Sequence, residues 1–280
     1  MAEPLSVILL TAAVGGAVGG GAGKFVEKSC DAGGRWLEAF WKDHQEKARL
    51  KAAENASNLL RSVATEIGFL EAAGTVTAEQ LEEALEHPEF SQLMQQAILG
   101  AAQTDDQEKH DVLARLIANR LQAQTDGRWA LAVKIAVDAV PRLTPNQLRT
   151  VAFVTLINYR VPGSKEADRD DYVAFFHRIM EPYRGLDVTY LDAMQLVAVS
   201  CGIYSIVKPH SLLAGLKKNL PDGYVVDQST LERSELYQAL DKAWQEQLFP
   251  FRLTSAGLAL GANVADALSG ERNNWASIFG

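Results

Sequence analysis

The sequence predicts an all-α protein: a multi-helix body with a small winged-helix-like C-terminal element and an N-terminal glycine-zipper helix. Three observations predict this class. Apolar residues recur at helical spacing along most of the 280 residues, capping residues precede several of these runs, and strand-like runs are scarce. With 48% hydrophobic and 22% charged residues, the composition is that of a folded chain rather than a disordered one.

The first segment, residues 1–23, is distinguished by its glycines. Residues 4–23 carry no charge, and six of the 21 glycines lie between Gly15 and Gly23. A helix of about 20 residues is long enough to span a bilayer, and small residues four apart let helices approach closely in lipid. We expect this segment to be a membrane and oligomerisation segment, the alternative being that it packs against the protein's own helices. The glycines of its two strips are Gly15, Gly19 and Gly23, and Gly16 and Gly20.

The second segment, residues 24–68, is amphipathic. Trp36, Leu37, Phe40 and Trp41 fall on one stripe of a helix, and the pair Gly33-Gly34 predicts a break from a short preceding helix. Trp36, Phe40 and Trp41 are candidates for the membrane interface, where aromatic side chains gather. Packing in the core of the body is the equally weighted alternative.

Basic residues follow the uncharged segment, whereas only Glu3 precedes it. If the segment spans a bilayer, this positive flank keeps the C-terminal body in the cytoplasm. The flanking residues are Lys24, Lys28 and Arg35.

An acidic helical domain is expected over residues 69–141. Residues 64–141 contain thirteen Asp and Glu but five Lys and Arg, which equals the whole net charge of −8. Thr77 is predicted to cap one helix, and Thr104 to cap another with Gln107 at the capping-box position. The acidic surface is either a solvated helix face or a docking face for a basic partner.

The last expected domain, residues 142–280, is helical and winged-helix-like. Thr144 and Pro145 predict a helix start, and further helices are expected over 167–184, 188–206 and 228–248. Residues 224–226 and 249–253 are the best candidates for a small hairpin.

None of the sequence motifs for enzymatic chemistry is complete. GGGAGK is not a phosphate-binding loop, because Val18 stands where glycine is required and Phe25 where a hydroxyl is required. Residues 198–202 resemble a degenerate nucleophile elbow but fall within an expected helix. The five histidines lie far apart, and Cys30 and Cys201 form no disulfide framework, which favours a reducing cytosol. We therefore expect no catalytic residues, no metal and no cofactor, and no enzyme.

Two stretches carry a family resemblance. In the first stretch, a helix opens with Thr104-Asp105-Asp106 and ends with Leu116–Leu121. Residues 135–143 and Thr144-Pro145 follow it. This order resembles the Abi-alpha (abortive infection alpha) proteins and related bacterial helical families. Phe251–Gly257 resembles the closing segment of winged-helix-like domains, in which a short strand leads into a helix capped by threonine. The resemblance implies antiphage defence and supplies no catalytic residue.

The expected function is that of an antiphage abortive-infection effector. On sensing a phage component, with a multimeric phage protein as the candidate trigger, the chain would move from the cytoplasm to the inner membrane or act while anchored there. Its partners would be membrane lipid and further copies of itself, because a single glycine-rich helix inserts poorly alone.

The alternative is a soluble helical adaptor or regulator that binds a protein or DNA through the C-terminal element. No segment has the basic excess typical of nucleic-acid-binding surfaces.

Overall fold

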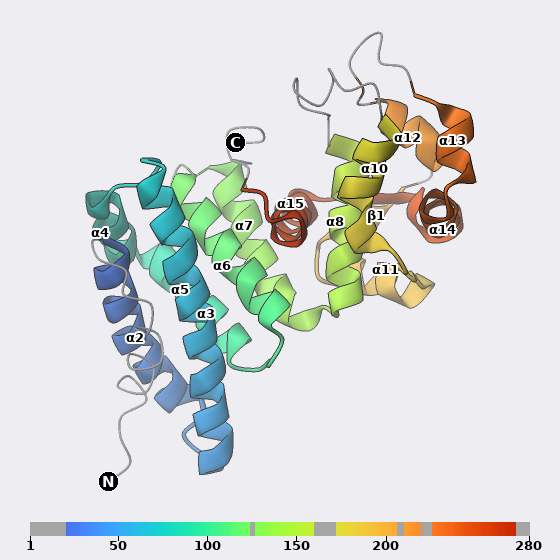
Figure 1. Cartoon of the computed structure of the whole chain (residues 1–280). Coiled ribbons are helices and arrows are strands. Elements are labelled where there is room, and N and C mark those ends of the chain that lie inside the picture. The colour runs from blue at the N-terminus through green and yellow to red at the C-terminus, as the bar shows by residue number, and fades with distance from the viewer. Residues whose placement is uncertain are drawn as a thin grey trace. The chain divides into compact units, whose positions relative to one another are not determined.

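The computed structural model describes residues 21–123, 127–159, 172–205, 210–218, 220 and 226–272 (Figure 1). Helices dominate these residues, and their only sheet has two short strands, so the all-α prediction is confirmed. The chain divides into two compact units, Met1–Arg142 with Asn274–Gly280, and Leu143–Asn273.

The first unit is a helical bundle in which α3 packs against both α2 and α6 (Figure 1). Its elements are α2 (Gly21–Phe40), α3 (Glu46–Ala72), α4 (Ala78–Glu86), α5 (Pro88–Ala101), α6 (Gln107–Gln122), α7 (Arg128–Ala139) and the 3-10 turn η1 (Val140–Arg142). On helix α6, Val112, Leu113, Leu116 and Ile117 are fully buried, as their spacing predicts.

Two helix boundaries in the first unit differ from expectation. Gly33-Gly34 does not break α2, because both glycines lie on its buried face and tertiary packing outweighs their low helix propensity. The break falls instead at residues 41–45, between α2 and α3.

Of the two predicted helix caps in the first unit, one is confirmed and the other is wrong. Thr77 caps α4 in a complete capping box with Gln80, as predicted. Helix α6 is capped by Asp106 rather than Thr104, since the Asp106 carboxylate accepts from the Glu108 amide at 3.0 Å. The Thr104 hydroxyl accepts instead from the Asp106 amide within the preceding loop, which delays the helix start.

The second unit is built on α8 and α15, which pack closely together. Its elements are α8 (Pro145–Tyr159), α10 (Tyr172–Met180), η2 (Glu181–Tyr183), α11 (Tyr190–Ala198), β1 (Gly202–Tyr204), α12 (Leu212–Lys218), α13 (Gln228–Arg233), α14 (Glu235–Ala243), the π-helical turn η3 (Trp244–Leu248), β2 (Phe251–Leu253) and α15 (Ser255–Ser269). A Cβ atom at Gly261 of α15 would lie 2.0 Å from Thr155 Oγ1 and 2.6 Å from the Val151 carbonyl oxygen of α8, so only glycine allows this approach.

Both predicted threonine caps in the second unit are confirmed. Thr144 and Gln147 exchange hydrogen bonds at the start of α8, and the Thr254 hydroxyl accepts from the Gly257 amide at 3.1 Å where β2 leads into α15. This strand-to-helix junction is the one that the sequence resemblance implied.

The predicted hairpin has the wrong partner strand. Strand β2 pairs antiparallel with β1, with Gly202 opposite Leu253, whereas Val226 is not in a strand and residues 224–225 lie outside the described part. Gly202 allows the pairing, because a Cβ atom there would lie 2.0 Å from the Phe251 ring.

Two predicted helices of this unit are shorter than expected. The helix expected over 188–206 ends at Ala198, since the chain turns at Ser200 with φ of 63° and then enters β1. The Thr254 hydroxyl holds this turn by donating to the Ser200 carbonyl at 2.5 Å. The helix expected over 228–248 is interrupted at Ser234, which caps α14.

Candidate functional site

The candidate membrane segment joins the body at helix α2. Gly23 lies half-buried in α2, while Gly15, Gly16, Gly19 and Gly20 lie outside the described residues. Among the described residues, no helix combines the length and the apolar character needed to cross a bilayer. The described part of the site is therefore the junction between the glycine-rich segment and the body.

Helix α2 packs against the body through a face that combines small and large residues. The buried positions recur at helical spacing, and they include Gly21, Ala22, Ser29 and the pair Gly33-Gly34. Phe25, Val26 and Leu37 are buried on the same face, which lies against α3, α4 and α5. The two small-residue strips of residues 15–23 do not continue along α2, because the next positions at spacing four are the exposed Lys24 and Glu27.

A single carboxylate closes the first described turn of α2. The amides of Gly21 and Ala22 donate to the two oxygens of Glu71, in the last turn of α3, at 3.0 and 3.1 Å. Free amides at a helix start carry partial positive charge, so a carboxylate stabilises them as a capping side chain does. A Cβ atom at Gly21 would lie 2.5 Å from Glu71 Oε1 and 2.9 Å from Ala78 Cα, so glycine is needed for this approach.

Glu82 of α4 holds the basic flank of the segment. Lys24 and Lys28, one turn apart on α2, place Nζ at 3.8 and 3.9 Å from Glu82 Oε1. All three side chains are about half exposed or more, so each ion pair contributes on the order of 0–1 kcal/mol. Sequence reasoning identified the lysines and missed their acidic partner, which lies in a different expected domain.

The three aromatic candidates for the membrane interface lie near the C-terminal end of α2. Phe40 is 54% exposed, whereas Trp36 and Trp41 are half-buried. The Trp41 ring lies between its neighbours, with centroids 5.8 Å from Phe40 and 4.6 Å from His44. The expected single stripe is therefore divided, since Leu37 faces the core and Phe40 faces outward.

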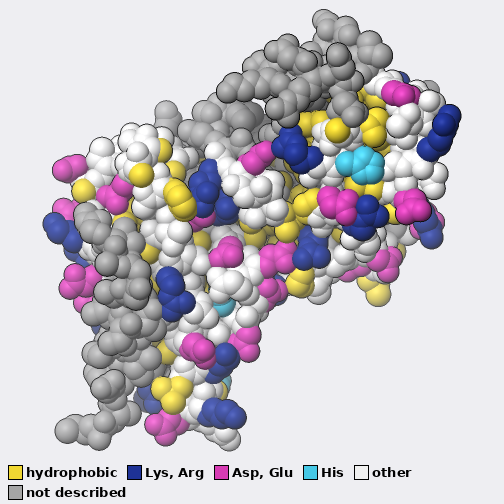
Figure 2. All heavy atoms as spheres, in the orientation of Figure 1, with side chains coloured by type: hydrophobic (Ala, Val, Ile, Leu, Met, Phe, Trp, Pro, Cys, Tyr) yellow, Lys and Arg dark blue, Asp and Glu magenta, His cyan; other side chains and the backbone are white. Residues whose placement is uncertain are grey.

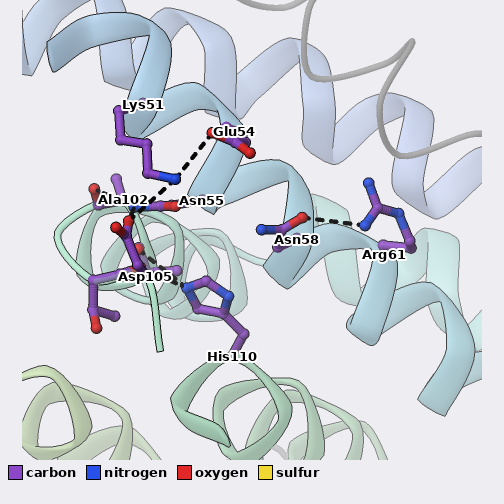
Figure 3. Close-up of polar contacts among 10 residues, drawn as sticks. Lys51, Glu54, Asn55, Asn58, Arg61, Ala102, Asp105 and His110 are labelled. Carbon is purple, nitrogen blue, oxygen red and sulfur yellow. Dashed lines mark hydrogen bonds and ion pairs between the residues drawn. The ribbon is translucent and has the colours of Figure 1, made fainter. Parts of the chain in front are cut away.

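A polar cluster ties α3 to the loop between α5 and α6 (Figure 3). Asn55 Nδ2 donates to Asp105 Oδ1 at 2.8 Å and lies 3.4 Å from the Ala102 carbonyl oxygen, while Lys51 Nζ lies 3.5 Å from Asp105 Oδ1. Asn58 and Arg61 form a separate pair further along α3. Because Asn55 is only 3% exposed and already bonded, the Asn-Ala-Ser sequon at residues 55–57 is not an accessible acceptor.

His110 completes this cluster from the opposite side. Its Nε2 lies 3.0 Å from the Thr104 carbonyl oxygen and 3.3 Å from that of Ala101, so Nε2 carries the proton and donates. The ring is fully buried, which denies it a substrate and makes the cluster a clamp on the loop rather than a catalytic centre.

Neither cysteine has the environment of a reactive thiol. Burial raises the pKa of Cys201 to about 12, and burial together with Asp31 and Glu27 raises the pKa of Cys30 to about 12. Both thiols therefore stay protonated near neutral pH. Within the described ranges, no group of three His, Cys, Asp or Glu is placed to hold a metal ion.

On one face of the first unit, side chains of both charges are mixed (Figure 2). On the face drawn in Figure 2, acidic and basic side chains alternate over the described residues of the first unit. Several acids of the segment 64–141 are already paired, as Glu66 is with Arg115 at 3.6 Å and Glu89 with Arg120 at 3.5 Å. Some acids of this segment thus serve internal contacts.

Comparison with known proteins places the chain in a family without assigning an activity. A search of curated proteins and a search of solved structures each find no match. A family model matches residues 23–225, which begins within α2 and continues past α12. The chain therefore belongs to the uncharacterised protein family whose model spans residues 23–225.

Proposed function

We propose that this protein is an antiphage effector of the abortive-infection type, whose N-terminal segment oligomerises and permeabilises the inner membrane. The segment is the uncharged, glycine-rich residues 5–23. The proposal places the family match within the Abi-alpha-like proteins that residues 104–145 resemble. A multimeric phage component serves as the trigger, since it concentrates bound copies at one place.

The observation that carries the proposal is the way α2 is attached at its first turn. The polar contacts of this turn are one carboxylate and two exposed ion pairs, while Ala22, Phe25 and Val26 are buried beneath them. A capping carboxylate contributes about 1 kcal/mol, and the ion pairs contribute less. A modest binding energy is enough to release these polar contacts, whereas the buried residues of α2 keep the helix packed against the body.

Release from Glu71 would also change the hydrogen-bond acceptors of the Gly21 and Ala22 amides. In a helix that runs on from upstream, the amides of Gly21 and Ala22 donate to carbonyls four residues earlier, so the Glu71 carboxylate competes with helix extension. Lys24 and Lys28, once free of Glu82, are placed to meet anionic headgroups just beyond the uncharged segment.

The test is membrane depolarisation in cells that make the full chain. Gly15→Leu with Gly19→Leu fills one small-residue strip and leaves α2 untouched, so toxicity and depolarisation should be lost. The triple variant that adds Gly23→Leu should behave alike, although Gly23 is half-buried in α2. Val7→Leu with Val14→Leu and Val18→Leu is the matched control, because it changes the same segment and keeps both strips.

Two outcomes separate this proposal from the adaptor alternative. If the Gly15 and Gly19 double variant still depolarises cells, the proposed mechanism is wrong. If the full chain never enters the membrane fraction, and changes at the β2–α15 junction abolish protection instead, the soluble adaptor accounts for the function.

A further inference from the structure

The second unit contains a cavity of about 400 Å³ with a basic lining. It lies where the last residues of α8 and α12 approach strand β2. Its polar lining comes from Asn158, Tyr159, His210, Lys218 and Arg252, and none of its described lining residues is acidic. The volume is within the range of small-molecule sites.

The two full positive charges of the cavity are available to a ligand. Lys218 is exposed at the end of α12 and has no ion pair or side-chain hydrogen bond among the contacts of the described residues. Arg252 Nη1 donates to the carbonyls of Phe249 and Phe251 at 2.8 and 3.1 Å. These bonds fix the guanidinium and leave its remaining N–H groups able to donate.

Helix ends offset only part of this charge. Helices α8 and α12 both direct their C-terminal ends toward the cavity, and each end carries about half a negative charge. Together they offset about one of the two positive charges, so a net positive potential remains. An anion is the ligand that this balance favours.

We propose that the cavity binds the phosphate group of a small, soluble phosphate monoester. A lysine ammonium and an oriented arginine fork form the donor pair that suits phosphate oxygens. The rings of Tyr159 and His210 supply surface for the organic part of the ligand. The His210 ring is held by the Trp244 ring, 5.4 Å away, and the Trp244 indole donates to the His210 carbonyl at 2.9 Å. This site is independent of the proposed membrane activity.

The experiment titrates inorganic phosphate into the full chain at constant ionic strength and follows backbone amide NMR shifts of Gly215 and Arg252. Wild-type shifts should saturate. Lys218→Ala should weaken binding about tenfold, since it removes a charged hydrogen-bond donor. Lys217→Ala is the matched control, because its Nζ contacts Gln228 outside the cavity lining, and its affinity should equal that of the wild type.

A second variant separates charge from geometry. Arg252→Lys keeps the positive charge and loses the fork, so it should also weaken phosphate binding while circular dichroism shows an unchanged fold. The proposal is overturned if the wild-type shifts rise without saturation. It is equally overturned if Lys217→Ala and Lys218→Ala weaken binding to the same extent.

Discussion

At the scale of single residues, the close contact of α8 and α15 depends on Gly261. Gly261→Ala should destabilise the chain by about 1–3 kcal/mol, because the new methyl group meets Thr155 Oγ1 and the Val151 carbonyl. Chemical denaturation followed by circular dichroism measures this change. Adding Thr155→Ala should recover only part of the loss, since the backbone carbonyl remains in place.

The matched control for Gly261 is Ser255→Ala, in the exposed first turn of the same helix. It should change the free energy of unfolding by less than about 0.5 kcal/mol. Equal losses for the two variants would show that the close contact of α8 and α15 does not exist in solution.

Removing one partner of the buried ion pair between Arg115 and Glu66 should lower the free energy of unfolding markedly. Replacing both partners by apolar residues should lower it much less. The side chains of Arg115 and Glu66 are 10% and 14% exposed. Arg115→Leu should cost about 3 kcal/mol, because it leaves a carboxylate buried without its guanidinium. The double variant with Glu66→Leu should recover most of that loss in a double-mutant cycle. Additive losses would contradict direct pairing.

Both cysteines should resist alkylation in the folded chain. With each thiol pKa raised to about 12, iodoacetamide at about pH 8 should label Cys30 and Cys201 only after unfolding. The unfolded chain loses these protons at lower pH than the folded chain does. Folding stability should therefore fall as the pH rises from 9.0 toward 12. Rapid labelling of native protein, detected by mass spectrometry, would contradict the buried positions.

At the scale of elements, the first turn of α2 should depend on Glu71. Glu71→Ala should speed amide exchange at Gly21 and Ala22 about fivefold, since it removes a cap of about 1 kcal/mol. Glu83→Ala is the control: for this exposed neighbour of Glu82, no hydrogen bond or ion pair with the described residues of α2 is found. Equal amide exchange in both variants would contradict the proposal that the Glu71 carboxylate competes with helix extension at the junction.

Combining Glu71→Ala with Glu82→Ala should release the junction more fully. The double variant should float with vesicles of anionic phospholipid at lower protein concentration than the wild type does, because Lys24 and Lys28 lose their partner. Glu83→Ala should float as the wild type does. A double variant that floats no better would show that these contacts do not restrain the segment.

The sequence predicts elements well where the signal is local. Thr77, Thr144 and Thr254 cap helices as predicted, because a cap involves a few neighbouring residues. The predicted Thr104 cap is wrong for a local reason, because Asp106 caps α6 instead, and other wrong predictions depend on partners distant in sequence. Gly33-Gly34 stays helical because its face is buried, and β2 pairs with residues 202–204 rather than 224–226.

Small residues spaced four apart in a helix allow close packing within a folded protein as well as between helices in a membrane. In α15, Gly257 and Gly261 are four apart and receive the Cys201 carbonyl and α8 at close range. The same spacing in residues 15–23 predicts close helix contact without identifying the partner. The uncharged length of residues 4–23, rather than the spacing alone, is what favours a membrane.

At the scale of the whole molecule, the candidate site was only partly predictable. The uncharged segment and its lysines are visible in the sequence. The carboxylates of Glu71 and Glu82 that hold the junction lie on α3 and α4, in what looks from composition like an unrelated acidic segment. The basic cavity joins residues 158–159, 210, 214–215, 218 and 252–253, a set that no local motif connects.

The central claim is that copies of the chain permeabilise a bilayer together. Dye release from anionic vesicles, measured against the concentration of full-length protein, tests it most directly. Release should rise more steeply than in proportion to concentration, and Gly15→Leu with Gly19→Leu should abolish it while the folded body is retained. Absence of release by the wild type, or equal release by the double variant, would contradict the account.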